Sequence, residues 1–481
     1  MRVAVVHYHL RTGGVTRVIQ NALASLNSAP VDAVVITAEP FPRGVSEGIL
    51  VRVAPGLAYD ERSRPVSTNA LRTQLEDAAR DAFGALPDLW HVHNHALGKN
   101  LVLPEVLHRM ASDGQRFLLQ IHDFAEDGRP GNYRRLIEHL GYAQSRRYLY
   151  PVAEHIHYAV LTDRDRHILE RAGVPPAQLH LLPNPVWLEA GGTPDAGPGG
   201  EQRLWLYPTR AIRRKNLGEL LLLAALSGEG DRFATTRAPE NPRERPRYER
   251  WVGFAETLRL PVEFEISTKR RMPFEALLQS AYSLVTTSIA EGFGLAFLEP
   301  WLIGRPLVGR NLPEITGAFR SAGVDLSPLY DRLDVPLEWI GARVLENRIQ
   351  AARQDFLAAY GRKPADDDCE RVFSAWVHDQ QVDFGRLDEP LQESIIGRVV
   401  ASDAERQQIS VHCLQPPSAR CVASNGDAVR HSFGLEAYGQ RLDAIYRGLV
   451  EFGMGPIESA ANEVILDWFL APERLFLLAT S

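Results

Sequence analysis

Two glutamates with seven residues between them, Glu291 and Glu299, belong to a segment whose residues could bind a polar ligand. Gly292 and Gly294 let the backbone approach such a ligand closely. A helix expected to begin near Gly294 would direct free N–H groups and its positive dipole end at the ligand. Glu299 would lie about two turns after Glu291, so both carboxylates could accept hydrogen bonds from the hydroxyls of a ligand. Glutamates at this spacing also arise by chance on a solvated helix, but the glycine turn between them favours a ligand site.

A second segment, from Arg210 to Asn216, carries four cationic side chains after an apolar strand. A cationic loop between a strand and a helix suits a diphosphate. Arg210 can bind two oxygens with its planar guanidinium group, and Lys215 adds a compact charge. Arg213 and Arg214 are expected to face solvent. Taken alone, the segment could equally be a charged surface loop.

An alternation of strands and helices must position these two segments. Apolar strands are expected at 2–9, 31–37, 50–53, 89–93, 117–121 and 157–161, and again at 204–208, 262–266, 283–288 and 306–308. Amphipathic or apolar helices are expected at 15–26, 217–226 and 274–281. Such alternation predicts an α/β fold with parallel sheets covered by helices on both faces. Ligands of these sheets bind at the carboxyl ends of the strands, and both segments follow strands.

A Gly- and Pro-rich break at 190–200 divides the two series of strands. We expect two Rossmann-like domains facing across a cleft, with a helical insertion in the C-terminal half. The predicted parts are an N-terminal domain at 1–187, a linker at 188–202, a C-terminal domain at 203–320, a largely helical insertion or extension at 321–430, and C-terminal helices at 431–481 that pack back across the domains. Residues 321–430 fit the strand–helix rhythm poorly, and their role is left open.

Composition narrows the class of protein. The 481 residues carry a formal net charge of −7, so no basic excess favours nucleic acid or an anionic membrane as a partner. The three cysteines, Cys369, Cys413 and Cys421, match no zinc pattern. The first apolar run is short and typical of a strand, and no apolar stretch approaches the roughly 20 residues that span a bilayer. A cytoplasmic protein without a transmembrane segment is expected.

Taken together, the motifs resemble those of the retaining GT-B glycosyltransferases of family four. That family is marked by a Glu-x7-Glu motif, here Glu291 and Glu299, and by an Arg-x4-Lys pair, here Arg210 and Lys215. Supporting segments follow in the same order: Gly13-Gly14, the strand 87–93, His122-Asp123, 182–184, and a last helix at 433–449 with Tyr446 near its end. The resemblance covers residues 1–315 and 432–450. The chain departs from the family at 309–314, so Arg310 and Asn311 are expected as variant donor or acceptor contacts.

The resemblance implies transfer of a hexose from a nucleotide-diphosphate sugar to a hydroxyl of a small-molecule, glycan or lipid-linked acceptor, with retention at the anomeric carbon. Arg210 and Lys215 would stabilise the leaving diphosphate in place of a metal, so no metal or other cofactor is expected. Glu291 would bind the sugar, Glu299 the ribose, and His122 the sugar from the other domain. The implied catalytic residues are His122, Glu291, Arg210 and Lys215, and the implied donor-binding residues are Gly13, Gly14, Arg210, Lys215, Met272, Gly292, Phe293, Gly294, Leu295 and Glu299. The segment 267–272 would face the nucleobase.

Several alternatives remain open. Asp366–Asp368 could suggest a metal, but a solvated turn before a helix is favoured. Asp163 and Asp165 resemble a metal motif, but they are expected at a helix start, where Asp offsets the dipole. The histidines at 7, 9, 91, 93 and 95 could bind a metal, but cleft-lining or core positions are favoured. At the level of function, the alternatives are a GT-B phosphorylase or epimerase, and a catalytically inactive GT-B binding module.

Overall fold

A computed structural model describes residues 1–11, 13–26, 29–40, 49–60, 66–188, 202–409 and 414–480. These residues form two compact units, each built from two stretches of chain. The first unit comprises 1–185 and 433–469, and the second comprises 186–432 and 470–481. The chain therefore passes between the units three times. The linker predicted at 188–202 lies outside the described residues except at its two ends.

The first unit contains a seven-stranded parallel sheet with the order β3-β2-β1-β4-β5-β7-β8. Its strands are β1 (Arg2–Val6), β2 (Asp32–Thr37), β3 (Val51–Val53), β4 (Leu89–His93), β5 (Phe117–Ile121), β7 (Ile156–Val160) and β8 (Leu179–Leu181). Every residue of β4, β5 and β7 is buried, as expected for central strands of a parallel sheet that is covered on both faces. The strands expected from the sequence are thus confirmed here, with small shifts at their ends.

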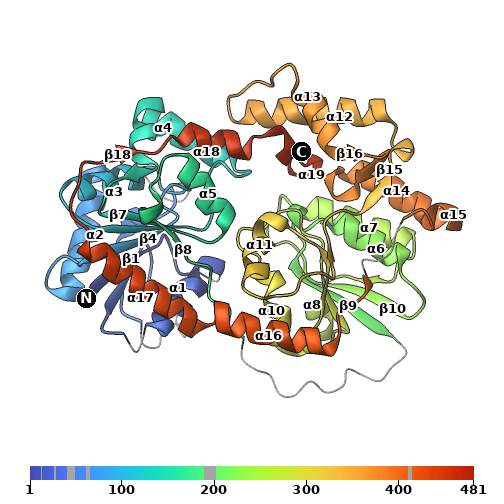
Figure 1. Ribbon diagram of the computed structural model, residues 1–481, viewed down its shortest axis with the longest axis horizontal. Helices are drawn as coiled ribbons and strands as arrows, with labels where there is room; N and C mark the ends of the chain where they lie inside the picture. The colour runs from blue at the N-terminus through green and yellow to red at the C-terminus, as the bar shows by residue number, and fades with distance from the viewer. Residues whose placement is uncertain are drawn as a thin grey trace. The chain divides into compact units, whose positions relative to one another are not determined.

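Helices connect the parallel strands of the first unit. They are α1 (Gly14–Ser25), α2 (Thr68–Phe83), α3 (Leu103–Ser112), α4 (Pro130–Tyr148) and α5 (Asp163–Arg171), and the later stretch of chain adds α17 (Leu435–Glu451) and α18 (Asn462–Phe469). A short antiparallel pair joins β6 (Pro151–Val152) to β18 (Glu458–Ser459). Helix α17 lies along α1 (Figure 1). Leu442 and Tyr446 of α17 share one buried cluster with Val3 of β1 and Ile19 of α1.

The second unit contains a six-stranded sheet with the order β11-β10-β9-β12-β13-β14, again parallel throughout. Its strands are β9 (Arg203–Arg210), β10 (Asp231–Arg237), β11 (Val262–Glu263), β12 (Ser283–Thr286), β13 (Leu307–Arg310) and β14 (Leu329–Tyr330). Two parallel sheets connected by helices confirm the predicted α/β fold.

The helices along this sheet are α6 (Leu217–Leu226), α7 (Arg245–Thr257), α8 (Ile266–Arg270), α9 (Phe274–Ser280), α10 (Glu299–Leu302) and α11 (Pro313–Ser321). The helix predicted at 217–226 is confirmed. The strand predicted at 262–266 is wrong beyond Glu263, because Glu265 adopts a left-handed φ of 58° and Ile266 begins α8. The alternating apolar residues of that segment therefore lie partly at the end of a strand and partly at the start of a helix, and not on one continuous strand.

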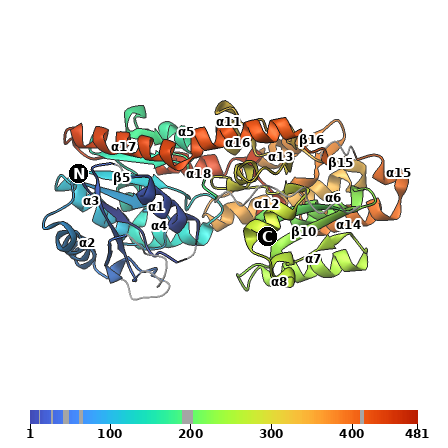
Figure 2. The ribbon, with the colours of Figure 1, turned by 90° about the horizontal axis from the view of Figure 1, so that it is seen from below.

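Residues 331–409 add a layer of their own to the second unit. They form α12 (Ala342–Ala359), α13 (Asp368–Trp376), α14 (Glu389–Ala401) and α15 (Asp403–Arg406), together with an antiparallel sheet of β15 (Asp334–Pro336), β17 (Gln381–Asp383) and β16 (Val377–His378). Helix α14 lies beside α6 in both views (Figures 1 and 2). The chain continues with α16 (Ala419–Phe433) and ends with α19 (Leu477–Thr480). No helix in the described parts of the chain has the length and apolar character needed to cross a membrane.

Candidate functional site

Lys215 and Glu291 come together at the carboxyl ends of two neighbouring strands. Strands β9 and β12 are parallel and adjacent. Lys215 lies on a 3-10 turn (Arg213–Lys215) after β9, and Glu291 lies in the loop after β12. The Nζ atom of Lys215 donates a hydrogen bond to the Glu291 carboxylate. The cationic segment and the glutamate segment, which are 76 residues apart at this contact, therefore form one site.

Hydrogen bonds to its backbone hold Lys215 in place. The Tyr207 hydroxyl donates to the Lys215 carbonyl oxygen at 3.2 Å, and the Thr287 hydroxyl donates to the same oxygen at 2.9 Å. Tyr207 also shares a 2.8 Å hydrogen bond with the Ser288 hydroxyl. The next residue, Asn216, has a left-handed φ of 49°, a conformation that Asn tolerates better than most residues. The lysine thus stands on a turn tied to both strands.

The charges of this site are partly balanced. Burial raises the pKa of Glu291, but the nearby charges of Lys215 and Arg214 and the hydrogen bonds from Lys215 and Ser288 outweigh it, so its pKa is lowered overall. Glu291 is therefore ionised at neutral pH. The exposed Arg214 leaves a further positive charge beside the pair. Such a site can hold an anion and, at the carboxylate, accept hydrogen bonds from hydroxyls.

The segment between Glu291 and Glu299 is built differently from the single helix predicted. Gly294 has a left-handed φ of 92°, and a Cβ at this position would stand 2.8 Å from Phe297 and 2.9 Å from Ile315. A 3-10 turn follows at Leu295–Phe297, and α10 begins only at Glu299. Pro300, which has no N–H to donate, stands in the first turn of α10 and ends any continuous helix before it. The prediction that one helix begins near Gly294 and carries Glu299 is therefore wrong: a 3-10 turn and a separate short helix occupy this segment.

The remaining predicted donor residues of the second unit lie at a strand end, after a helix and in the segment that follows β12. Arg210 ends β9, is exposed, and pairs with Glu240 at 3.4 Å. Phe293 is buried and meets Phe319 edge-on, whereas Gly292 and Leu295 are half-buried. Met272, also half-buried, follows α8.

Two expectations about arginines are wrong. Arg213 was expected to face solvent, but its guanidinium group makes two 3.0 Å hydrogen bonds to Glu389 of α14. Arg310 was expected as a ligand contact, but it is 3% exposed and its nitrogen atoms bind Glu219 and Asp383. Both carboxylate partners from α14 and β17 lie far along the chain, so local spacing gave no signal for them.

Asn311, the other expected ligand contact, is buried as well. Its amide donates to Asp331 at 2.6 Å, and its carbonyl oxygen accepts a hydrogen bond from Thr316 at 2.6 Å. Arg310 and Asn311 therefore stabilise the second unit, and the prediction that their side chains meet a ligand is not supported.

In the first unit, His122 follows β5 and is buried with a specific partner. Its Nε2 atom lies 2.8 Å from Nδ1 of His93, and the two rings stack. Its backbone N–H donates to Oδ1 of Asn94 at 2.7 Å. Burial lowers the pKa of His122 to about 4, so the ring is neutral at neutral pH. Asn94, with a φ of 56°, was not predicted as part of this site. It directly follows the strand that ends at His93, and residues after strands are the ones expected to line ligand sites.

The other histidines of the first unit support this arrangement. His91 binds the Tyr446 hydroxyl at 2.7 Å and Gln120 at 2.9 Å, and its ring stacks on that of His93. Burial lowers the pKa of His7 and of His91 to about 3. Gly13 precedes α1 with an extended backbone, and Gly14 begins that helix. Since β1, β4 and β5 are parallel neighbours, His122 and the two glycines follow strands at the same sheet edge.

The rival metal motifs have structural partners. Thr162 caps α5, and Asp165 in its first turn pairs with Arg164. Asp368 begins α13, where it is buried and pairs with Arg353 at 2.9 Å, so the expectation of a solvated turn is wrong for this residue. Within the described ranges, no group of three or more His, Cys, Asp and Glu side chains is arranged to hold a metal ion.

Comparison with known proteins extends these observations. No protein-family model matches the chain. Mannosylglucosyl-3-phosphoglycerate synthase from Petrotoga mobilis is 26% identical over 337 residues, and the match covers 65% of each chain. The chain thus spans about two thirds of the length of this curated relative.

Two solved structures share the architecture. HepE from Anabaena, solved with UDP and glucose, has a TM-score of 0.53 at 11% identity and covers 93% of this chain and 99% of its own. A glycosyltransferase from Rickettsia africae has a TM-score of 0.53 at 13% identity, with coverage of 94% and 98%. The chain has the GT-B fold. The predicted resemblance to GT-B glycosyltransferases of the family-four type is confirmed by the curated relative and by this fold.

Proposed function

We propose that this GT-B protein is a retaining glycosyltransferase that moves a hexose from a nucleotide-diphosphate sugar to an acceptor hydroxyl. One observation carries the proposal: the Lys215 ammonium group and the Glu291 carboxylate meet at the carboxyl edge of the second sheet. An ammonium group for a diphosphate beside a carboxylate for sugar hydroxyls is the pair of groups that a nucleotide-sugar requires. The UDP bound to HepE, which has the same fold, adds support.

In this proposal Lys215 and Arg210 stabilise the charge that develops on the leaving diphosphate. The backbone of Gly292, Phe293 and Gly294 and the Glu291 carboxylate bind the sugar, and His122 of the first unit contacts the sugar as a neutral ring. The bond from the anomeric carbon to the diphosphate oxygen breaks, and a bond to the acceptor oxygen forms on the same face. The acceptor proton passes to the departing phosphate oxygen.

The remaining donor contacts belong to the same proposal. Glu299 binds the ribose hydroxyls, and Leu295 and Met272 border the nucleotide, with the segment 267–272 facing the nucleobase. Gly13 and Gly14 of the first unit border the acceptor and the phosphates.

A thermal-shift screen of UDP-, GDP- and ADP-linked sugars tests the proposal. A donor at 100 times its dissociation constant stabilises the protein by about 2.7 kcal/mol, so one nucleotide class should raise the melting temperature. The Lys215→Met variant, compared with its own unliganded state, should lose this shift, whereas the exposed Lys363→Met control should keep it. A wild-type protein that responds to none of the donors would refute the proposal. Product NMR with a donor of known anomeric configuration then tests retention.

A further inference from the structure

Residues 331–409, the added layer of the second unit, contribute three polar side chains to contacts with the Lys215 turn and with the network at the start of α6. These side chains are Asp383, Glu389 and Gln392, from the end of β17 and from α14. Each is buried. Glu389 and Gln392 have partners in or directly beside the turn that carries Lys215, whereas Asp383 binds Arg310, which in turn binds Glu219 of α6. We call residues 331–409 the support segment.

Gln392 reaches the residue that follows Lys215. Its amide nitrogen donates to Oδ1 of Asn216 at 3.0 Å and to the Phe384 carbonyl at 3.2 Å. Asn216 in turn donates to Glu219 at 2.8 Å. The Asn216 side chain therefore spans from α14 to the first turn of α6, in a residue whose left-handed backbone ends the Lys215 turn.

Glu389 holds the residue that begins the same turn. It accepts two hydrogen bonds from Arg213, both at 3.0 Å, and the two side chains are 11% and 8% exposed. A paired, planar contact of this kind fixes both the position and the orientation of the arginine. The Lys215 turn is thus held at its first residue by Glu389 and just after its last by Gln392.

Asp383 ties the support segment to the base of α6 through Arg310. The Arg310 guanidinium group binds Asp383 at 2.8 and 2.9 Å and Glu219 at 2.7 Å. Glu219 also accepts a 2.7 Å hydrogen bond from the Tyr330 hydroxyl. Gly385 packs so closely on Arg310 that a Cβ there would stand 2.5 Å from the guanidinium group, so the fit leaves little room for movement.

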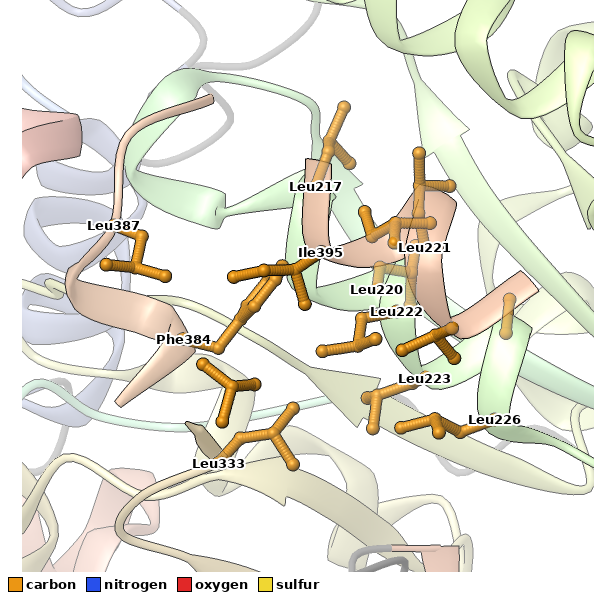
Figure 3. Close-up of a cluster of buried hydrophobic side chains, with 14 of the residues drawn as sticks. Leu217, Leu220, Leu221, Leu222, Leu223, Leu226, Leu333, Phe384, Leu387 and Ile395 are labelled. Carbon is orange, nitrogen blue, oxygen red and sulfur yellow. The ribbon is translucent and has the colours of Figure 1, made fainter. Parts of the chain in front are cut away.

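Apolar packing joins the same elements. Figure 3 shows Leu217 and Leu221 of α6 in one cluster with Phe384, Leu387 and Ile395 of the support segment. Helix α6 is apolar on nearly all sides and buried over almost its whole length, so the sheet alone cannot cover it. Helix α14 covers the remaining side, and its approach brings Gln392 against Gly218, where a Cβ would stand 2.1 Å from the glutamine oxygen.

We propose that the support segment positions the Lys215 turn for the donor diphosphate, and that Gln392 and Glu389 are its positioning residues. The inference rests on the proposed function, in which Lys215 binds the donor. Without these contacts the turn would still follow β9, but the Lys215 side chain would adopt several orientations. Donor binding would then have to order this side chain, and the entropy cost would lower the donor affinity.

The test compares Gln392→Ala with Val399→Ala, a buried apolar position on the same helix whose side chain has no polar contact to make. Hydrogen–deuterium exchange of peptides covering 211–219 reports the order of the turn, and isothermal titration with UDP reports donor affinity. Gln392→Ala should exchange faster in these peptides and bind UDP about three- to tenfold more weakly. Val399→Ala should match wild type in both measurements, even if its melting temperature falls as much as that of Gln392→Ala.

The outcomes separate this inference from the proposed function. Unchanged exchange at 211–219 in Gln392→Ala would overturn the inference whatever the UDP affinity, and so would faster exchange with unchanged affinity. Equal weakening of UDP binding in Val399→Ala would also overturn it, because general destabilisation would then explain the effect. If wild-type protein binds no nucleotide sugar at all, the proposed function fails, and the inference fails with it.

Discussion

Replacing Arg310 by Met should destabilise the second unit strongly. The guanidinium group is 3% exposed and lies between Glu219 and Asp383, whose side chains are 0% and 5% exposed. Met fills a similar volume but removes the cation that the two buried carboxylates share. Breaking a buried ion pair by removing one partner costs about 3–5 kcal/mol, and a loss in this range is expected in the free energy of unfolding.

The size of the loss should depend on pH. In the wild-type protein, burial raises the pKa of Asp383, but the Arg310 charge and its hydrogen bonds bring the pKa below its ordinary value. Removing Arg310 raises the pKa of both carboxylates in the folded state. Groups with a raised folded pKa favour folding below their unfolded pKa, and this contribution disappears as the pH rises. The difference between wild type and variant should therefore be smaller at pH 5 than at pH 8.

Urea titrations followed by tryptophan fluorescence at the two pH values measure this difference. Arg430→Met, which removes an exposed pair with Asp427, is the matched control and should change stability by less than about 0.5 kcal/mol. An Arg310→Met variant within 1 kcal/mol of wild type at pH 8 would refute the reasoning, because the cluster would then contribute little net stability. A loss that grows toward pH 5 would also refute it, because burial would then not raise the pKa of the two carboxylates in the variant.

Three further predictions concern the proposed donor-binding residues and one buried carboxyl group of the first unit. Glu291→Ala should mainly lower kcat and Glu299→Ala mainly raise the donor KM, each about ten- to a hundredfold; steady-state kinetics with the reverse pattern would contradict the assigned roles. Turnover should survive EDTA because Lys215 and Arg210 supply positive charge, and loss of activity that magnesium restores would show otherwise. Burial raises the pKa of Glu126 to about 7, so its contribution to stability is lost as the pH rises through that value. Glu126→Gln should therefore be more stable than wild type at pH 8, by up to about 3 kcal/mol, and not at pH 5; equal melting curves at pH 8 would count against it.

The sequence predicted the elements whose signal is local. The apolar run of β4 and the ten residues of α6 were expected where they occur, because each is buried on nearly every side. The strand order of the two sheets also follows the rules for parallel α/β folds. The cationic segment and the glutamate segment, which we propose bind the donor, lie together because adjacent parallel strands bring their following loops to one edge.

Sequence reasoning failed where a contact spans a long stretch of chain or where one residue changes the backbone. Arg213 was expected to face solvent because a basic run usually does, yet Glu389 lies 176 residues away and binds it. The prediction for Arg310 failed because its partners Glu219 and Asp383 lie 91 and 73 residues away along the chain. The single helix expected from Gly294 to Glu299 overlooked Pro300, which resets the start of α10.

The division of both units into two stretches of chain affects the order in which the protein can fold. The first unit lacks α17 until residue 451 has been synthesised, although residues 1–185 supply its whole parallel sheet. Until then Val3 and Ile19 are not covered by Leu442 and Tyr446, with which they form one buried cluster. Apolar surface of this kind is prone to aggregation while it is uncovered. A fragment ending near residue 185 is therefore a poor choice for expression, whereas residues 433–469 supplied as a separate peptide should restore its solubility.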